Sequence, residues 1–227
     1  MIVGKARTDI RAEIDAQYEI LSQMIEDIAD RYQEGELRFE KYVDRMAEED
    51  SEGDENIKHT IQRSFDTPLK KQYSLTIEAR KILFCTIFSY FESMLHGLID
   101  YYKIPIGKTK YVSELVEAIK KEYETRYSEC FPSYGYTETI ICKQYRIIRN
   151  YFMHGKLDKD ADKELLRSYA LGLSGLVWYE WDKYEIESNS FLTGALDRIN
   201  GFLERIEVAY CTKEKEYNWK NTKYYTI

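Results

Sequence analysis

The stretch "RKILFCTIFSYFESMLHGLIDYY", residues 80–102, decides the fold, because it is too apolar for an exposed segment and too long for a strand. Apolar residues recur in it, and just upstream, at three-, four- and seven-residue steps, which is the period of a helix. We therefore expect a central, heavily buried helix from about Leu69 to Tyr102. The residues expected to face the core are Leu75, Ile82, Leu83, Ile87, Phe91, Leu95, Leu98 and Ile99.

Helical periodicity extends to both sides of this segment, and no stretch alternates convincingly like a strand. Only three prolines interrupt the 227 residues, so long helices can continue. The pattern predicts an all-α helical bundle with an additional long amino-terminal helix. The expected helices span about 8–47 (bent or interrupted at Gly35), 69–102, 111–127, 137–155, 161–184 and 189–211, with an acidic loop or linker over 48–56.

Charge divides the chain into three expected parts. Residues 1–57 hold seven Lys/Arg and 17 Asp/Glu, a net charge of −10, whereas the remaining residues hold 26 and 23, a net charge of +3. We expect an acidic amino-terminal helix and linker (1–57), the bundle itself (58–211) and an aromatic tail (212–227). This distribution is unlike that of a bulk nucleic-acid binder, which needs a basic domain, but it permits a small local basic site.

Several classes of protein are excluded by what the sequence lacks. No apolar run reaches the length of a membrane span, and the first residues do not resemble a signal peptide, so we expect a cytoplasmic protein without membrane contact. The four cysteines form no C-x-x-C pair, and the three histidines are too few for a zinc site. We therefore expect reduced thiols, no metal and no cofactor.

The stretch "YRIIRNYFMHGK", residues 145–156, is the candidate site. Acids make up 40 of the 227 residues, yet none occurs from position 143 to 156. An Arg and a His five positions apart are weak evidence alone, and on an ideal helix their side chains lie about 140° apart. The two could converge if the helix ended at His154, which Gly155 would permit. The cationic residues of this cluster are Lys143, Arg146, Arg149 and Lys156.

These residue types suit cleavage of RNA without a metal, in which the 2′-OH attacks the adjacent phosphorus. Such a reaction needs a base for the hydroxyl proton and positive charge for the transition state. Histidine can act as the base because its pKa lies near neutrality, and the planar guanidinium of arginine matches phosphate oxygens. On this hypothesis His154 and Arg149 carry the chemistry, and Asn150 positions a phosphate or the imidazole.

The segment "RNYFMHG" (149–155) resembles the Arg-polar-x-x-x-His signature of the HEPN superfamily, and "FSYFESMLHGLID" (88–100) resembles an earlier HEPN helix with an aromatic–Glu pair. The resemblance covers roughly residues 69–211. It implies a compact helical bundle and a metal-independent endoribonuclease in a toxin–antitoxin or antiphage system. The signature residues match at Arg149, Asn150, His154 and Gly155, and the pair matches at Phe91 and Glu92.

The resemblance further implies a homodimer, in which two motifs face each other across a two-fold axis and share the RNA. Lys143, Arg146 and Lys156 would then bind the RNA backbone, and Glu92 would orient Arg149 or Arg146. An antitoxin or another defence protein is a further implied partner. One antitoxin-paired subgroup carries a tyrosine two residues after the histidine, and here that position is Lys156.

A second hypothesis stays open beside the enzyme. The chain could be a non-catalytic helical domain that binds a nucleotide or a partner protein and keeps the motif for packing. In that case we expect His154 to be buried against its own subunit, whereas the enzyme needs an Arg149–His154 pair open to solvent. The sequence does not reveal the RNA target, an activating signal or the role of the acidic segment.

Overall fold

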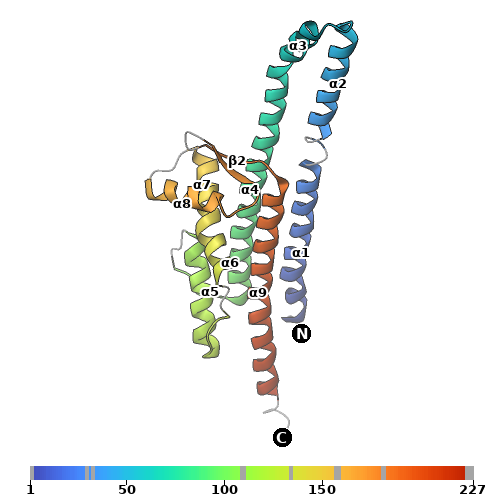
Figure 1. Ribbon diagram of the computed structural model, residues 1–227. Coiled ribbons are helices and arrows are strands. Elements are labelled where there is room, and N and C mark those ends of the chain that lie inside the picture. The colour runs from blue at the N-terminus through green and yellow to red at the C-terminus, as the bar shows by residue number, and fades with distance from the viewer. Residues whose placement is uncertain are drawn as a thin grey trace.

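The computed structural model (Figure 1) describes residues 3–28, 31, 34–107, 111–132, 135–155, 160–179 and 183–222, with the side chains of 3–9, 72, 160–162 and 217–222 left out. The described chain is mainly helical, which confirms the all-α class. Its elements are α1 (Val3–Ile28), α2 (Glu34–Asp50), α3 (Glu55–Ser64), α4 (Asp66–Tyr102), α5 (Val112–Tyr127), α6 (Tyr136–Thr139), a π-helical segment (Ile140–Tyr145), α7 (Arg146–His154), α8 (Asp160–Ala170), β1 (Leu176–Tyr179), β2 (Lys183–Ile186) and α9 (Asn189–Thr222).

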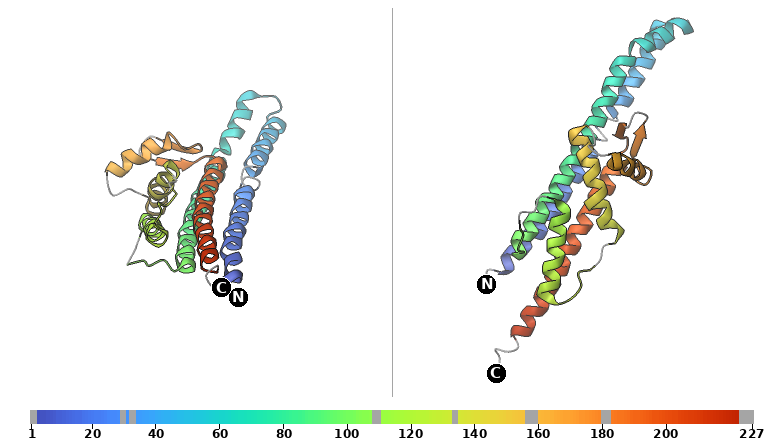
Figure 2. Two further views of the ribbon diagram at one scale, coloured as in Figure 1. Left: turned by 90° about the horizontal axis from the view of Figure 1, so that it is seen from below. Right: turned by 90° about the vertical axis from the view of Figure 1, so that its left-hand side faces the viewer.

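Helix α4 is the central element, as the sequence predicts. It packs against α1 and α9 on one side and against α5 and α7 on the other (Figure 2). Six of its eight expected core residues are buried: Leu83, Ile87, Phe91, Leu95, Leu98 and Ile99. The expectation is wrong for Leu75 and Ile82, which are 49% and 67% exposed.

The two exceptions have a physical reason. Leu75 lies next to Thr76, whose hydroxyl contacts Glu36 of α2, in the part of α4 that extends away from the bundle beside α2 and α3 (Figure 1). Ile82 lines a groove between α4 and α7. Helical periodicity identifies an apolar stripe on a helix, but it cannot tell which part of that stripe a neighbouring helix covers.

Helix α1, expected outside the bundle, packs into it. Its apolar residues Ile14, Leu21 and Ile25 are buried in the same core as α4 and α9. Polar contacts fix it to α9, where Arg11 Nη2 lies 2.7 Å from Glu204 Oε1 and the Tyr18 hydroxyl donates to Asp197 Oδ1 at 2.8 Å. The acidic surface of this helix therefore covers one side of the bundle.

The acidic stretch 48–56, expected to be a loop or linker, is a turn over 51–54 and helical on both sides of it. Helix α2 continues to Asp50, and α3 begins at Glu55, where Asp54 Oδ1 accepts a hydrogen bond from the backbone N–H of Asn56 at 2.8 Å. A side chain that caps a helix in this way stabilises its first turn. With the start of α4, these helices form a helical arm that projects from the bundle (Figure 1).

The helix expected over 161–184 is wrong beyond Ala170, where α8 ends. A short antiparallel hairpin follows, in which Leu176 pairs with Ile186 and Trp178 with Tyr184. Gly175 precedes it with φ +84°, and a Cβ at this position would lie 3.0 Å from Ser188 Cβ. Few residues other than glycine adopt such a backbone conformation, so Gly175 permits the tight turn that leads from the end of α8 into β1.

The carboxyl-terminal segment is also more helical than expected. Helix α9 extends to Thr222, so the aromatic tail predicted from residue 212 is helical as far as it is described. Lys213 Nζ contacts Glu129 and Glu216, which holds this part of α9 against the loop after α5. Residues 223–227 of the predicted tail lie outside the described residues.

A buried arginine joins three parts of the fold. Arg80 of α4 is 6% exposed, and it donates from Nε to Asn189 Oδ1 at 2.8 Å and from Nη1 to the Glu187 carbonyl at 2.7 Å. The Asn189 amide in turn donates to the carbonyl of Ile25 at 2.9 Å. Arg80 therefore connects α4 with the β2–α9 junction and, through Asn189, with the end of α1.

We predict that Arg80→Ala lowers the free energy of unfolding by about 2–4 kcal/mol, because it leaves two partly buried oxygen acceptors without a donor and opens a cavity. Urea unfolding followed by circular dichroism measures this value. Arg63→Ala, on the exposed face of α3, is the matched control and should change the free energy by less than about 0.5 kcal/mol. Equal effects of the two substitutions would contradict the role assigned to Arg80.

Candidate functional site

The helix that carries the candidate motif begins and ends where the sequence predicts. Its first residue is Tyr136, after Gly135 with φ +50°, and its last is His154, before Gly155 with φ +69°. The left-handed conformation at Gly155 ends the helix directly after the histidine. The π-helical segment Ile140–Tyr145 was not predicted, and such segments often occur near functional sites.

Arg149 lies half-buried on α7, with its guanidinium partly oriented by its neighbour. Its Nη1 donates to Asn150 Oδ1 at 3.1 Å. Its Nε is shielded from solvent and has no hydrogen-bond partner among the described residues. Burial raises the pKa of the Cys85 thiol of α4, and the positive charge of Arg149 opposes this rise.

Arg146 and Lys143 lie one and two turns before Arg149. The Arg146 guanidinium lies 6.0 Å from the centre of the Tyr111 ring, and its Nε is also enclosed without a hydrogen-bond partner in the described part of the chain. Lys143 is exposed. Within the described residues no carboxylate forms an ion pair with Lys143, Arg146 or Arg149, although the fold brings Glu117 and Glu138 to a pocket that Lys143 also lines.

His154 is exposed at the end of α7 and makes no hydrogen bond or ion pair with any residue that the structure describes. Asn150, one turn earlier, is half-buried. The structure therefore places Arg149, Asn150 and His154 on the last two turns of one helix, but it does not join the imidazole to the guanidinium. Lys156 lies outside the described residues.

Glu92 does not make the contact that the sequence suggested. It is half-buried on α4, beside the fully buried Phe91, and it forms no ion pair or hydrogen bond with Arg146 or Arg149 in the described structure. Phe91 faces the core and packs edge-on against Phe202 of α9 at 6.0 Å. Within one chain, therefore, no contact among the described residues supports a role for Glu92 in orienting either arginine.

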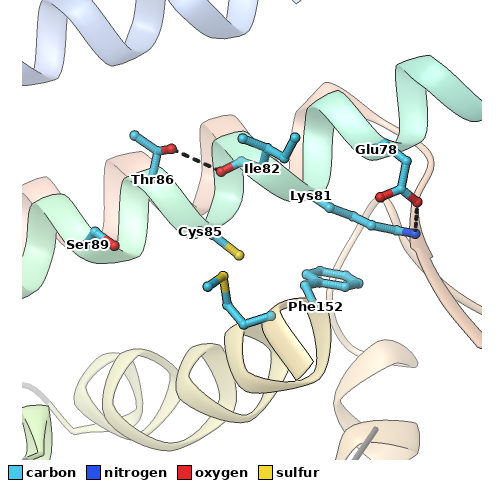
Figure 3. A pocket seen from close by; sticks show the side chains of 8 residues that line it. Glu78, Lys81, Ile82, Cys85, Thr86, Ser89 and Phe152 are labelled. Atoms are coloured by element: carbon cyan, nitrogen blue, oxygen red, sulfur yellow. Dashed lines mark hydrogen bonds and ion pairs between the residues drawn. The ribbon is translucent and has the colours of Figure 1, made fainter. Parts of the chain in front are cut away.

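A groove of about 360 Å³ lies between α4 and α7, beside the motif. In Figure 3, Cys85 and Phe152 point into the same space, and Lys81 pairs with Glu78 at one end. Two apolar side chains on its edge are strongly exposed, Ile82 at 67% and Met153 at 55%. The residues that line it are Glu78, Lys81, Ile82, Cys85, Thr86, Ser89, Phe152 and Met153.

Sequence reasoning missed three residues of this region. The charge of Arg149 acts on Cys85, Met153 edges the groove, and Tyr111 lies 6.0 Å from the Arg146 guanidinium. Only Met153 had a signal in the sequence, because it lies within the motif at a position that ideal helical geometry turns away from Ile148 and Phe152. Cys85 and Tyr111 belong to other helices, and only the fold brings them to the motif.

The fold and the site together define an all-α bundle with a basic helix whose histidine end is open to solvent. Comparison of the chain with protein-family models, with curated proteins and with solved structures finds no match.

No group of three or more His, Cys, Asp or Glu that could hold a metal occurs among the described residues. One described helical segment, Glu55–Tyr102, is long and apolar enough to cross a membrane by length and composition, and 56% of its most apolar window is buried inside the protein.

The electrostatic effect of Arg149 on the Cys85 thiol gives a test of the site. We predict that Arg149→Gln raises the pKa of the Cys85 thiol, because removing the positive charge leaves burial unopposed. The rate at which iodoacetamide alkylates Cys85, followed against pH by peptide mass spectrometry, measures this pKa. Cys130 is exposed outside the groove and serves as the internal control, with an unchanged profile. An unchanged or lowered pKa at Cys85 would contradict the electrostatic effect assigned to Arg149.

Proposed function

We propose that this chain is a metal-independent endoribonuclease of the HEPN type that cleaves RNA through attack of the 2′-OH. One observation carries the proposal: two arginines on the motif helix keep enclosed Nε–H groups without partners in the described structure, on the same helix as an exposed histidine. Buried donors are usually satisfied, so unpaired ones in a basic site favour an anionic ligand. A phosphodiester supplies such an anion.

The residues take distinct roles in this reaction. His154, in its neutral form, accepts the proton of the 2′-OH as the oxygen attacks phosphorus. Arg149 stabilises the negative charge that develops on the non-bridging oxygens, and Asn150 orients the guanidinium through the 3.1 Å hydrogen bond. The leaving 5′-oxygen takes a proton from the imidazolium of His154, which thereby returns the proton that it removed from the 2′-OH, and the products are a 2′,3′-cyclic phosphate and a 5′-hydroxyl. Arg146, Lys143 and Lys156 bind the flanking backbone.

The proposed active form is a homodimer. In one chain His154 is exposed and makes no contact with Arg149 in the described structure, so a single copy provides an incomplete site. The exposed Ile82 and Met153 edge the groove beside the motif, and large exposed apolar side chains favour association. A two-fold contact over this surface would bring two motifs together and double the local positive charge.

The biological setting follows from the resemblance alone. We propose that the enzyme acts in the cytoplasm, in a toxin–antitoxin or antiphage system, with an antitoxin or another defence protein as an additional partner. The alternative is a non-catalytic binding domain. The mainly apolar lining of the groove and the separation of His154 from Arg149 favour that alternative in a single chain. The exposure of His154 favours the enzyme, because the alternative expects this residue to be buried.

Cleavage of RNA in EDTA is the first test of the proposed activity. We predict that His154→Ala and Arg149→Ala each lower the rate of cleavage by about 100-fold or more, because each removes a group that acts in the transition state. Gel analysis of a labelled single-stranded RNA measures the rate, and acid treatment of the product identifies the cyclic phosphate. Lys41→Ala, an exposed cation of the helical arm, is the control and should cleave normally. Wild-type protein without activity, or mutants with normal activity, would exclude the enzyme.

The oligomeric state tests the proposed dimer surface. We predict that Ile82→Glu converts a dimer into a monomer and abolishes cleavage, since it places a charge in the apolar contact. Sedimentation velocity measures the mass, and thermal unfolding checks the fold, which should be little affected because Ile82 is 67% exposed. Leu171→Glu is the matched control, because Leu171 is 87% exposed on the loop after α8. A wild-type monomer, or an active dimer of Ile82→Glu, would rule out this surface.

A further inference from the structure

A polar pocket of about 210 Å³ lies between α5 and the π-helical segment, and it shares no lining residue with the groove beside the motif. Helix α5 packs against the π-helical segment, and Figure 1 shows it beside α6, which leads into that segment. One residue of the pocket, Lys143, belongs to the cationic residues that lead along the helix to Arg149. The residues that line the pocket are Ser113, Glu117, Glu138, Thr139, Cys142 and Lys143.

The side chains of this pocket both donate and accept hydrogen bonds. Ser113 and Thr139 carry hydroxyl groups, which do either, whereas the ammonium of Lys143 only donates. Glu117 is exposed, and within the described residues its carboxylate makes no hydrogen bond or ion pair, although its charge acts on Lys120 one turn later. The pocket therefore offers a carboxylate from α5 and an ammonium from the π-helical segment to a ligand.

The charges around the pocket nearly cancel. Glu138 pairs with Lys120 of α5, whose Nζ lies 3.0 Å from Glu138 Oε1. Glu117 and Lys143 carry the other two charges of the lining, one of each sign. Cys142 adds none, because burial and the Glu138 carboxylate raise the pKa of its thiol to about 12. Such a balance disfavours a small ion, and it suits a neutral ligand whose edge carries both donors and acceptors.

A nucleobase is a neutral ligand of this kind. The pocket is smaller than the roughly 300–1,000 Å³ of pockets for drug-sized molecules, which suits a single planar heterocycle. Guanine presents two adjacent donors, N1–H and the N2 amino group, which match the two oxygens of a carboxylate such as Glu117. Its O6 and N7 accept hydrogen bonds from lysine. Since the other three bases present only one donor group each, guanine matches the pocket best.

The pocket lies beside the proposed path of the RNA. Lys143 precedes His154 by 11 residues, which corresponds to roughly 16 Å along a helix. Arg146 lies between them, and its guanidinium is 6.0 Å from the ring centre of Tyr111, which is 54% exposed. Exposed aromatic rings of this kind stack on bases. A base in the pocket therefore belongs to a nucleotide that flanks the cleaved bond.

We propose that the pocket between α5 and the π-helical segment binds a guanine base of the RNA. Glu117 accepts hydrogen bonds from N1–H and the N2 amino group, Lys143 donates to O6, and Tyr111 stacks on the neighbouring base. The π-helical segment provides one wall of the pocket, and such segments often occur at functional sites. This assignment rests on the proposed function, because an RNA bound along α7 is what brings a base to the pocket.

Binding of uncleavable oligonucleotides tests the pocket without an enzymatic readout. The probes are fluorescein-labelled 2′-O-methyl oligouridylates, followed by anisotropy, in which guanosine, inosine or adenosine replaces one uridine at each position in turn. We expect guanosine at one position to strengthen binding about tenfold, because hydrogen bonds to a carboxylate are among the strong ones. Inosine lacks the N2 amino group and should bind about threefold or more below guanosine, and adenosine should bind like uridine.

Matched variants separate this pocket from general charge and from misfolding. Glu117→Gln keeps the size of the side chain, and it should abolish the preference for guanosine without changing the melting temperature, since Glu117 is exposed. Glu40→Gln removes the same charge from an exposed position of α2 and should keep the preference. Tyr111→Ala should weaken the binding of every probe, because it removes the stacking surface. Equal binding of the guanosine and uridine probes, or a preference that survives Glu117→Gln, would overturn the proposal.

The outcomes also distinguish this pocket from the proposed ribonuclease. Cleavage of RNA without any preference for guanosine in binding would overturn the pocket assignment and leave the enzyme. A preference that depends on Glu117, in a protein that cleaves no RNA, would support the pocket assignment and overturn the enzyme. Guanosine 5′-monophosphate, followed by calorimetry, is the last comparison. If it binds as tightly as the guanosine oligonucleotide, the pocket serves a free nucleotide and its assignment to RNA is wrong.

Discussion

Burial of the apolar face of α4 is the constraint on which the rest of the structure depends. Phe84 shows how far it extends, because its ring packs against Tyr145 at 5.7 Å, Phe152 at 6.1 Å and Phe191 at 5.0 Å. One fully buried side chain of α4 thus touches the π-helical segment, the motif helix and α9. Burial of one such ring contributes about 1.5–3 kcal/mol, and it also fixes the direction in which α7 presents its polar residues.

Cations of the bundle differ in whether a carboxylate pairs with them. The chain has a net charge of −7, and its acids are engaged at many places, such as the Lys120–Glu138 pair beside the motif and the Arg11–Glu204 pair between α1 and α9. Around the arginines of α7 the described residues provide no such partner. An unpaired, partly enclosed guanidinium lowers stability, because burial removes it from water without providing a counter-charge.

Tyr145 connects the motif helix α7 with α4 and α9. Its ring packs against Phe84 of α4, its hydroxyl accepts a hydrogen bond from Arg198 of α9, and the next residue, Arg146, begins α7. The π-helical segment ends at this tyrosine, so the register of the motif helix relative to α9 is set here. A change in the packing of one aromatic ring therefore affects both the motif helix and α9.

The sequence by itself determined the helical class, the central position of α4, the motif helix and its end at Gly155, because these depend on local periodicity and on glycine geometry. It also located Arg149, Asn150 and His154 on one helix end without nearby acids. Tertiary structure alone decided that α1 belongs to the core, that Ile82 is exposed, that Glu92 does not contact the arginines in the described chain, and that Arg198 rests on Tyr145. The physical reason is that a helical pattern records which face of a segment is apolar, whereas the neighbour that covers or exposes that face is chosen by packing between segments distant in the sequence.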